Sequence, residues 1–259
     1  MQFNRRAKLR VGNREWTELR LVLVVEAGDS SKPSRLTAEI YNLSDDSAGY
    51  LSTAGDLTAD FFAGYDTPSL IGSGDVQRVE TDWRGPDRIT RIECADGGKQ
   101  NAKRVQVAES GQVSTRGMIG KIADKMGFSG VEFGKIDDVK LPNGLVFSGP
   151  GREQIDALAK TSGAKVHTNL GRLIVLPTGG SLDKSATLIT PDTGLIGSPQ
   201  RTEEGIKFTC LLNPHIVPRR IVKVQSREIS GFYIVRSYRH SADTHGQDWT
   251  TEVEAVRRG

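Results

Sequence analysis

The apolar positions of the first 95 residues recur with a period of two. The alternation runs through six segments: 7–11, 19–25, 36–40, 57–63, 76–81 and 88–95. Such alternation predicts half-buried β-strands, and the glycine-rich turns between them favour a small antiparallel barrel or sandwich. Ser44, followed by Asp45 and Asp46, offers an N-cap and an acidic first turn for one short helix.

The period changes near residue 100. Ser114 can cap a helix that Gly127 can end, with apolar residues at helical spacing: Met118, Ile119, Ile122, Ala123 and Met126. A second helix is predicted after Pro150, carrying Ile155, Leu158 and Ala159 inward and ending at Gly163. Strands 164–167 and 172–176 then predict a hairpin that turns through residues 169–171. Together these elements predict a small α+β module.

Strands return in the last third of the chain, in segments 205–214, 220–226, 232–240 and 248–256. Residues 70–73 and 195–198 both have the sequence Leu-Ile-Gly-Ser, each before a strand that holds a cysteine, which hints at a duplication. We therefore predict a mainly β fold in which two antiparallel β-barrels flank the α+β module. The expected domains are 1–99, 100–182 and 183–259.

Composition supports this division and excludes several classes. The chain has 259 residues, of which 36% are hydrophobic and 29 are glycine, as expected for folded protein with more than one core. The 35 Lys and Arg residues against 32 Asp and Glu give a net charge of +3, without the basic excess of a dedicated nucleic-acid-binding protein.

The apolar run 21–25 is far shorter than the ~20 residues of a membrane helix, so we expect no membrane insertion. Charged residues from Lys8 to Arg14 interrupt the stretch where a signal peptide needs apolar residues, so we expect no secretion. Cys94 and Cys210 are far apart and have no cluster of metal-ligand residues around them. We expect two reduced, buried thiols.

The most enzyme-like cluster is His240, Asp243 and His245, with Asp248 close behind. These side chains can ligate a metal or act as a base and its orienting partner. The segment 241–246 consists mainly of turn residues between two predicted strands, so a hairpin turn is the favoured interpretation. A third ligand would have to come from elsewhere, and the sequence does not place His167 or His215 beside the turn.

Other motifs for chemistry are weak. Residues 149–152, Gly-Pro-Gly-Arg, precede a helix but lack the P-loop and dinucleotide patterns, so we expect a helix entry. Ser73 and Ser148 lie in glycine-rich turns without a nearby histidine, which does not support a catalytic triad. Basic residues at 5–10, 218–220 and 257–258 are typical of solvated strand edges. We predict no catalytic, cofactor-binding or metal site, no cofactor and no enzyme activity.

Short segments in all three parts of the chain together suggest a family. In the first part they are 36–44, 61–65, 70–74 and 90–97; in the middle, 156–159 and 173–177; in the last part, 195–199, 210–214, 221–224, 231–236 and 243–255. They resemble the first barrel, the small middle module and the closing barrel of late control protein D-like baseplate hub proteins of tailed bacteriophages, whose barrels are tail-tube-like.

This resemblance implies a structural hub at the tail tip. Three chains with two similar barrels each place six barrels around an axis, so that one face can meet a six-fold tail tube and the other a three-fold spike. The implied partners are further copies in a homotrimer, tail-tube proteins, a spike or needle protein and other baseplate proteins. DNA passes through the channel during ejection, so we expect a neutral or acidic lumen. The implied location is the virion, after assembly in the bacterial cytoplasm.

Alternatives remain open. A tail-tube or distal-tail protein uses the same barrel, although the second barrel and the module favour the hub. A metal hydrolase would use His240, Asp243 and His245. A glycan-binding module would use the middle α+β unit, where the aromatic residues are Phe128, Phe133 and Phe147.

Overall fold

The computed structural model describes residues 4–28, 33–53, 57–182 and 185–258. The chain forms two compact units: unit 1 comprises 1–29, 34–96 and 183–259, and unit 2 comprises 30–33 and 97–182. Most of the ordered structure is β, with a few helices, which confirms the predicted fold class. Among the described residues, no helix combines the length and apolar character needed to cross a membrane.

The N-terminal half of unit 1 follows the predicted alternation. Its elements are β1 (Arg5–Val11), β2 (Arg14–Trp16), β3 (Leu21–Gly28), β4 (Arg35–Tyr41), α1 (Asp45–Ser52), β5 (Thr58–Tyr65), β6 (Ser69–Arg84) and β7 (Asp87–Ala95). In β3, Leu21, Leu23 and Val25 are fully buried while the residues between them are half-buried. Ser44 caps α1 as predicted, because its side chain accepts the N–H of Ser47.

The C-terminal half of unit 1 adds six strands and a short 3-10 helix. They are β15 (Ala186–Ile189), η2 (Pro191–Thr193), β16 (Leu195–Arg201), β17 (Gly205–Leu211), β18 (Ile221–Gln225), β19 (Ser230–Asp243) and β20 (Trp249–Arg257). β15 pairs with β18 in parallel, which differs from the fully antiparallel expectation. The alternation of four residues cannot reveal strand direction, since it reports only which face is buried.

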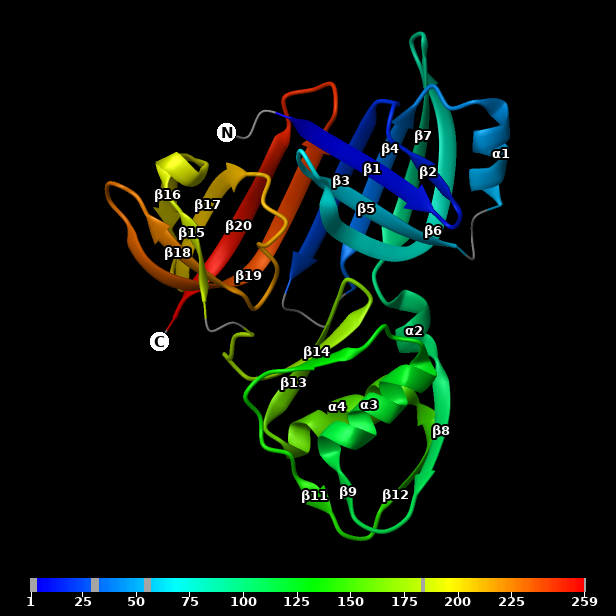
Figure 1. The fold of residues 1–259 in the computed structure, drawn as a ribbon, viewed down its shortest axis with the longest axis vertical. Coiled ribbons are helices and arrows are strands. Elements are labelled where there is room, and N and C mark those ends of the chain that lie inside the picture. The colour runs from blue at the N-terminus through cyan, green and yellow to red at the C-terminus, as the bar shows by residue number, and fades with distance from the viewer. Residues whose placement is uncertain (1–3, 29–32, 54–56, 183–184, 259) are drawn as a thin grey trace. The chain divides into compact units, whose positions relative to one another are not determined.

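Both halves belong to one 13-stranded sheet, so the two expected barrels are not closed, separate bodies. Its main path runs β16-β17-β20-β19-β3-β4-β7-β6-β5-β1-β2, and β18 and β15 branch from β19. The orange strand β19 lies between the red strand β20 and the blue strand β3 (Figure 1). One continuous hydrophobic core lies under strands from both halves. The backbone groups of β3 and of the second half of β19 are therefore paired with each other across the two halves.

The two halves of unit 1 repeat the same strand order. The sequence β3-β4-β7-β6-β5-β1 in one half corresponds to β16-β17-β20-β19-β18-β15 in the other. Pairing registers agree as well: Ile40 of β4 faces Thr90 of β7, and Cys210 of β17 faces Thr251 of β20. The duplication therefore extends to individual residue pairs, except that β15 runs opposite to β1.

The duplication at which the Leu-Ile-Gly-Ser echo hinted is present, but the two copies of the echo do not lie at equivalent positions. Residues 70–73 lie in β6, which corresponds to β19, whereas residues 195–198 lie in β16, which corresponds to β3. Cys94 and Cys210 also lie on strands that do not correspond, β7 and β17. The repeat is carried by strand order and register, which four matching residues do not report.

Unit 2 is the predicted α+β module. Its elements are α2 (Gly98–Ala102), β8 (Arg104–Glu109), β9 (Val113–Ser114), α3 (Thr115–Met126), β10 (Val131–Phe133), β11 (Lys140–Leu141), β12 (Leu145–Pro150), α4 (Gly151–Thr161), β13 (Ala164–Asn169) and β14 (Arg172–Pro177). Ser114 caps α3 and Gly127 ends it in a left-handed conformation, as predicted. The β13–β14 hairpin turns through Leu170 and Gly171, both at positive φ.

Candidate assembly interface

The internal junction between the halves of unit 1 is formed by β19 and β3. The first half of β19 pairs with β18, and its second half, from Ser237 to Asp243, pairs with β3 in antiparallel register. Arg239 of β19 forms an ion pair with Glu26 of β3 directly opposite. Because one face of these strands is buried, a slip by one residue would turn every side chain to the opposite face, so the register of this contact fixes how the halves meet.

A polar cluster holds the end of the junction. Asp243 accepts a hydrogen bond from Arg20 Nη2 at 2.8 Å and one from the backbone N–H of His245 at 2.9 Å. Burial on its own raises the pKa of the Asp243 carboxyl, but these hydrogen bonds, with one from the Gly246 backbone, outweigh it and lower the pKa. The carboxylate thus stays charged and ties β19 to the segment before β3.

Trp249 closes the apolar side of the junction. It starts β20, faces Ala242 of β19 and is fully buried. The Tyr65 ring meets it edge-on with centroids 6.4 Å apart, and the Arg5 guanidinium lies 5.7 Å from the ring centroid. Since Tyr65 and Arg5 belong to β5 and β1, the core of one half covers the hairpin of the other.

The predicted hairpin turn is confirmed, with β19 extending three residues past His240. His240 is fully buried, and its Nδ1 lies 2.8 Å from Thr251 Oγ1. Burial lowers the pKa of His240 to about 3, despite a smaller opposing effect from the Ile216 backbone. His245 Nδ1 is 2.9 Å from Thr244 Oγ1, while Asp243 pairs with Arg20.

These side chains do not converge on one point. Among the described residues, no group of three or more His, Cys, Asp or Glu side chains is arranged to hold a metal ion. His167 is buried in β13 of unit 2 and His215 is exposed in the loop between β17 and β18. The hairpin cluster therefore stabilises a turn and a strand junction.

Packing explains the glycine-rich segment before α4. A Cβ on Gly151 would lie 2.5 Å from Met126 Sδ, so the glycine allows α4 to pack closely against α3. Arg152 donates hydrogen bonds to Val166 O at 2.7 Å and to Asp156 Oδ2 at 3.0 Å. The arginine thus ties the helix to the hairpin of unit 2, as expected for a helix entry.

The two cysteines are free and buried, as predicted. Burial raises the pKa of both Cys94 and Cys210 to about 12, with nearby carboxylates Asp75 and Glu93 adding to the effect at Cys94. At neutral pH both are thiols, which are poor nucleophiles and poor metal ligands.

The face of the sheet away from the core carries interleaved charges of both signs. Charged residues at alternate positions of the central strands include the carboxylates Glu26, Glu39, Glu80, Asp82, Glu93, Glu252 and Glu254 and the cations Arg35, Arg78, Arg84, Arg91, Lys207 and Arg239. We call this surface the mixed-charge face.

Five of its cations form ion pairs within the same face. The pairs are Arg239–Glu26, Arg78–Glu80, Arg91–Glu93 at 3.3 Å, Arg84–Glu39 at 3.6 Å and Lys207–Glu254 at 3.9 Å. Such exposed pairs add little stability, typically about 0–1 kcal/mol each. Their effect is on the local field, because each carboxylate offsets a positive charge that would attract phosphate.

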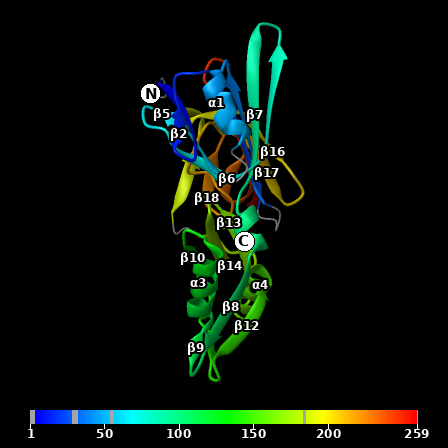
Figure 2. The same cartoon turned by 90° about the vertical axis from the view of Figure 1, so that its right-hand side faces the viewer.

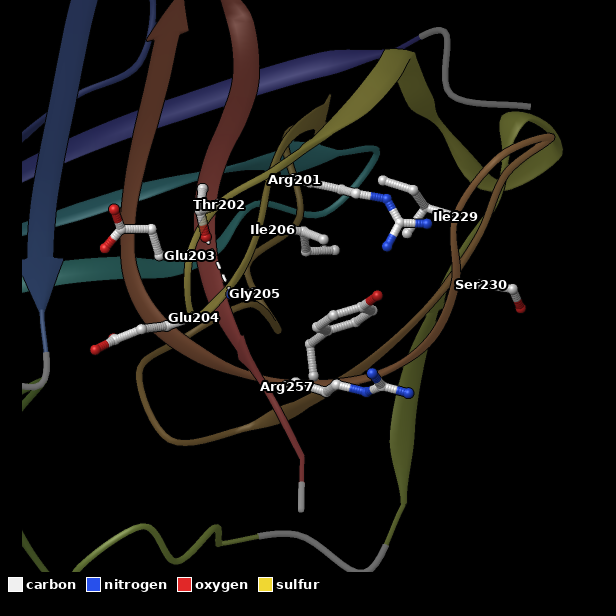
Figure 3. Close-up of a pocket in the computed structure, with 10 residues that line it drawn as sticks. Arg201, Thr202, Glu203, Glu204, Gly205, Ile206, Ile229, Ser230 and Arg257 are labelled. Carbon is white, nitrogen blue, oxygen red and sulfur yellow. Dashed lines mark hydrogen bonds between the residues drawn. The ribbon is translucent and has the colours of Figure 1, made fainter.

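A pocket of about 370 Å³ opens at one end of the C-terminal half. It is lined by Arg201, Thr202, Glu203, Glu204, Gly205, Ile206, Ile229, Ser230, Tyr233 and Arg257. Glu203 and Glu204 point away from Arg201 and Arg257 (Figure 3). Glu204 forms an ion pair with Arg236. The pocket adjoins the end of the edge strand β16, so it borders a surface suited to strand pairing.

Solved structures share this fold at low sequence identity. The 43 kDa tail protein of prophage MuSo2 from Shewanella oneidensis has a TM-score of 0.69 at 10% identity, covering 98% of this chain and 97% of that one. A tail protein from Neisseria meningitidis MC58 has a TM-score of 0.68 at 12% identity, covering 99% and 98%. At these identities the comparison establishes the fold alone.

A third similar structure comes from Escherichia coli. Its c3393 protein is described as a type VI secretion component with structural similarity to the T4 bacteriophage tail proteins gp27 and gp5; the TM-score is 0.61 at 9% identity, covering 97% of this chain and 77% of that one. A comparison with curated protein sequences finds no significant match.

The family comparison settles the assignment. The model of the family "Baseplate hub gp41" matches residues 3–255, which span both halves of unit 1 and all of unit 2. The chain therefore belongs to the baseplate hub gp41 family of phage tail proteins.

Proposed function

We propose that the protein is a structural, non-catalytic hub at the phage tail tip, which joins the six-fold tail tube to the three-fold spike and gives DNA its passage during ejection. Three copies form a ring, with residues 1–99 and 183–259 as two barrel-like domains and 100–182 as the module. The observation that carries the proposal is the repeated strand order, joined within one sheet by β19 and β3.

The duplication supplies a symmetry argument. Two similar halves in each chain give three copies six similar positions around the ring axis. A surface with six similar positions can match a six-fold tube, while the three copies of unit 2 retain three-fold symmetry for a spike. The family membership supports a place in the baseplate of the virion.

The mixed-charge face supports the channel. If the sheet continues around the ring, this face of its central strands lines the inner wall. Carboxylates and cations are interleaved on it and five of its cations are held in ion pairs, although the whole chain has a net charge of +3. Each free cation on such a wall would add salt-dependent retention of phosphates, so compensated cations favour passage over binding.

The ring is tested by light scattering of the purified protein together with imaging of assembled particles. We expect three copies per ring and three per tail tip, placed between tube and spike. Six identical copies in stacked rings would contradict the hub and favour the tail-tube alternative. A monomeric chain in the particle would contradict both.

A further inference from the structure

We propose that residues 77–84 of β6 in one copy pair in antiparallel fashion with β16 of a second copy, repeating between chains the β19–β3 junction that exists within one chain. This inference rests on the proposed ring and names the strands that close it. Its partner is a second copy of this chain, and the contact is heterologous, so each copy uses both surfaces.

A shared bulge aligns β6 with β19. The register of β6 against β7 shifts between Val76 and Arg78, leaving Gln77 extra, and the register of β19 against β20 shifts between Val235 and Ser237, leaving Arg236 extra. The strand on the other side of each long strand pairs with it only before the bulge, namely β5 with β6 and β18 with β19. The bulge thus divides each long strand at the same place.

Residue pairs beyond the bulge also correspond. Thr81 lies five residues after Val76 and faces Thr90, and His240 lies five residues after Val235 and faces Thr251. Each pair forms a hydrogen bond between side chains, 3.0 Å between the Thr81 and Thr90 hydroxyl oxygens and 2.8 Å between His240 and Thr251. Thr90 and Thr251 are both fully buried. The two hairpins are therefore equivalent in detail.

The two hairpins differ in what lies at their outer edge. Residues 237–243 of β19 pair with β3, whereas residues 78–84 of β6 pair, among the described strands, with β7 alone. The strand that corresponds to β3 is β16, which pairs with β17 alone in the described part of the chain. Within one chain, the junction between β19 and β3 is formed, whereas the corresponding strands β6 and β16 do not pair with each other.

Trp83 lies on the part of β6 that has no described strand at its outer edge. It is 70% exposed, near the end of the β6–β7 hairpin, which extends past the other strands of unit 1 (Figure 2). Its counterpart in β19 is Ala242, which is 1% exposed because β3 and the core beneath it cover that position. Large exposed aromatic side chains are favoured anchors of protein interfaces. A second copy would cover Trp83 as the chain's own β3 covers Ala242.

The correspondence predicts the register. In β19, Ser241 faces Val24 of β3. Asp82 of β6 corresponds to Ser241, and Gln200 of β16 corresponds to Val24. Asp82 should therefore face Gln200 in the contact between two copies. Trp83 then lies opposite the irregular residues 197–199 of β16. The exposed Ile196 flanks this bulge and adds apolar surface to the contact.

β16 also carries a feature of protected edges. Arg201 corresponds to the fully buried Val25, so its charge lies on the core-facing side of an edge strand. A charge at such a position discourages indiscriminate strand pairing. Pairing with a specific partner in a fixed register remains favourable, which suits a ring of defined size.

Cysteine pairs test the register directly. Asp82→Cys and Gln200→Cys are introduced into one chain, with Asp82→Cys and Arg201→Cys as the matched control, because a one-residue slip turns the side chain to the opposite face. Mild oxidation forms a disulfide only when the Cβ atoms lie about 3.5–4.5 Å apart. We expect the first pair to give covalent trimers under denaturing electrophoresis and the control to stay monomeric. The native cysteines are buried and stay reduced.

The outcomes separate this inference from the ring itself. Trimers by light scattering that crosslink through neither pair, or through the slipped control, overturn the β6–β16 pairing and leave the trimer standing. A chain that stays monomeric by light scattering and forms no crosslink overturns the trimer, and the pairing with it.

Trp83→Ala gives an independent measurement without crosslinking. Loss of a central aromatic anchor typically weakens association by ~10-fold or more. We expect such a rise in the dissociation constant of the trimer for Trp83→Ala, and less than a twofold change for Val146→Ala, another apolar residue, in unit 2, that is 80% exposed. Circular dichroism checks that both variants fold. Equal effects of the two substitutions would overturn the anchor.

Discussion

His240 and Thr251 form a fully buried hydrogen bond, 2.8 Å long, at the position where the two halves of unit 1 are joined. Its partner in the repeat, between Thr81 and Thr90, links two hydroxyl groups at 3.0 Å. The histidine therefore takes the place of the exposed Thr81 hydroxyl, and because it is buried its role is in packing and hydrogen bonding. The same site also makes folding sensitive to acid.

The free energy of unfolding should fall as the pH is lowered, because of His240. Its pKa is about 3 in the folded protein against an ordinary 6.5, so between these values the unfolded chain takes up a proton that the folded chain excludes. Stability is fully present above pH 6.5 and falls by up to about 1.4 kcal/mol per pH unit below it. Urea unfolding at pH 4.5 to 6.5 measures the slope. His240→Asn should flatten it, and an unchanged slope in that variant would contradict the assignment.

Asp243→Ala should destabilise unit 1 by about 1–3 kcal/mol. The substitution removes a partly buried carboxylate that accepts hydrogen bonds from Arg20 and from the His245 backbone. Asp46→Ala is the control, since Asp46 pairs with Arg14 at 2.5 Å but is 81% exposed, and such a pair contributes about 0–1 kcal/mol. Chemical unfolding of both variants gives the comparison. Equal losses would show that the Asp243 cluster is not special.

Two glycine substitutions should have opposite effects. A Cβ at Gly72 in β6 would lie 2.5 Å from Leu36 Cδ2 and 2.9 Å from Val25 Cγ2, so Gly72→Ala should overpack the core and cost about 1–3 kcal/mol. Gly120 lies inside α3 with nothing within 4 Å of a Cβ, so Gly120→Ala should stabilise unit 2 by about 0.5–1 kcal/mol. Thermal unfolding of both variants tests the signs. A neutral Gly72→Ala would show that β6 can move away from β4.

Neutralising carboxylates on the mixed-charge face should make the assembled protein retain DNA. Glu26→Gln, Glu39→Gln and Glu93→Gln together release Arg239, Arg84 and Arg91 from their ion pairs. We expect tighter binding of a duplex oligonucleotide in fluorescence anisotropy, with a salt slope steeper by about 0.9 for each additional phosphate that the released arginines neutralise.

The control for that experiment neutralises Glu132, Glu203 and Glu228 to glutamine, which changes the net charge equally at residues that are not part of the mixed-charge face. If both triple variants bind DNA to the same extent, net charge and not the arrangement of this face governs retention, and the face is not the channel wall.

Local patterns in the sequence predicted the elements well. The period of two located the strands of unit 1, and Ser44, Ser114 and Gly127 located helix ends, because capping depends on one side chain or one backbone conformation. The hairpin containing His240 was also predictable, since its turn residues favour that conformation locally. Family membership followed from segments spread over the whole chain.

The pairing between distant strands was not predictable from the same patterns. The β19–β3 junction joins residues more than 200 positions apart, and alternation says which face of a strand is buried without naming its neighbour. The Leu-Ile-Gly-Ser echo misplaced the repeat for the same reason. The sequence did not predict that Trp83 is exposed either, because an aromatic residue in an alternating strand is usually buried.

The sequence by itself thus determined the fold class, the α+β module, the buried state of the two thiols and the family. Only the tertiary structure decided that both β parts share one sheet, that His240 and Asp243 serve a junction, and that β6 and β16 present its unfilled counterpart. The physical reason is that local conformation depends on neighbours in the chain, whereas strand pairing and charge compensation depend on residues that the fold brings together.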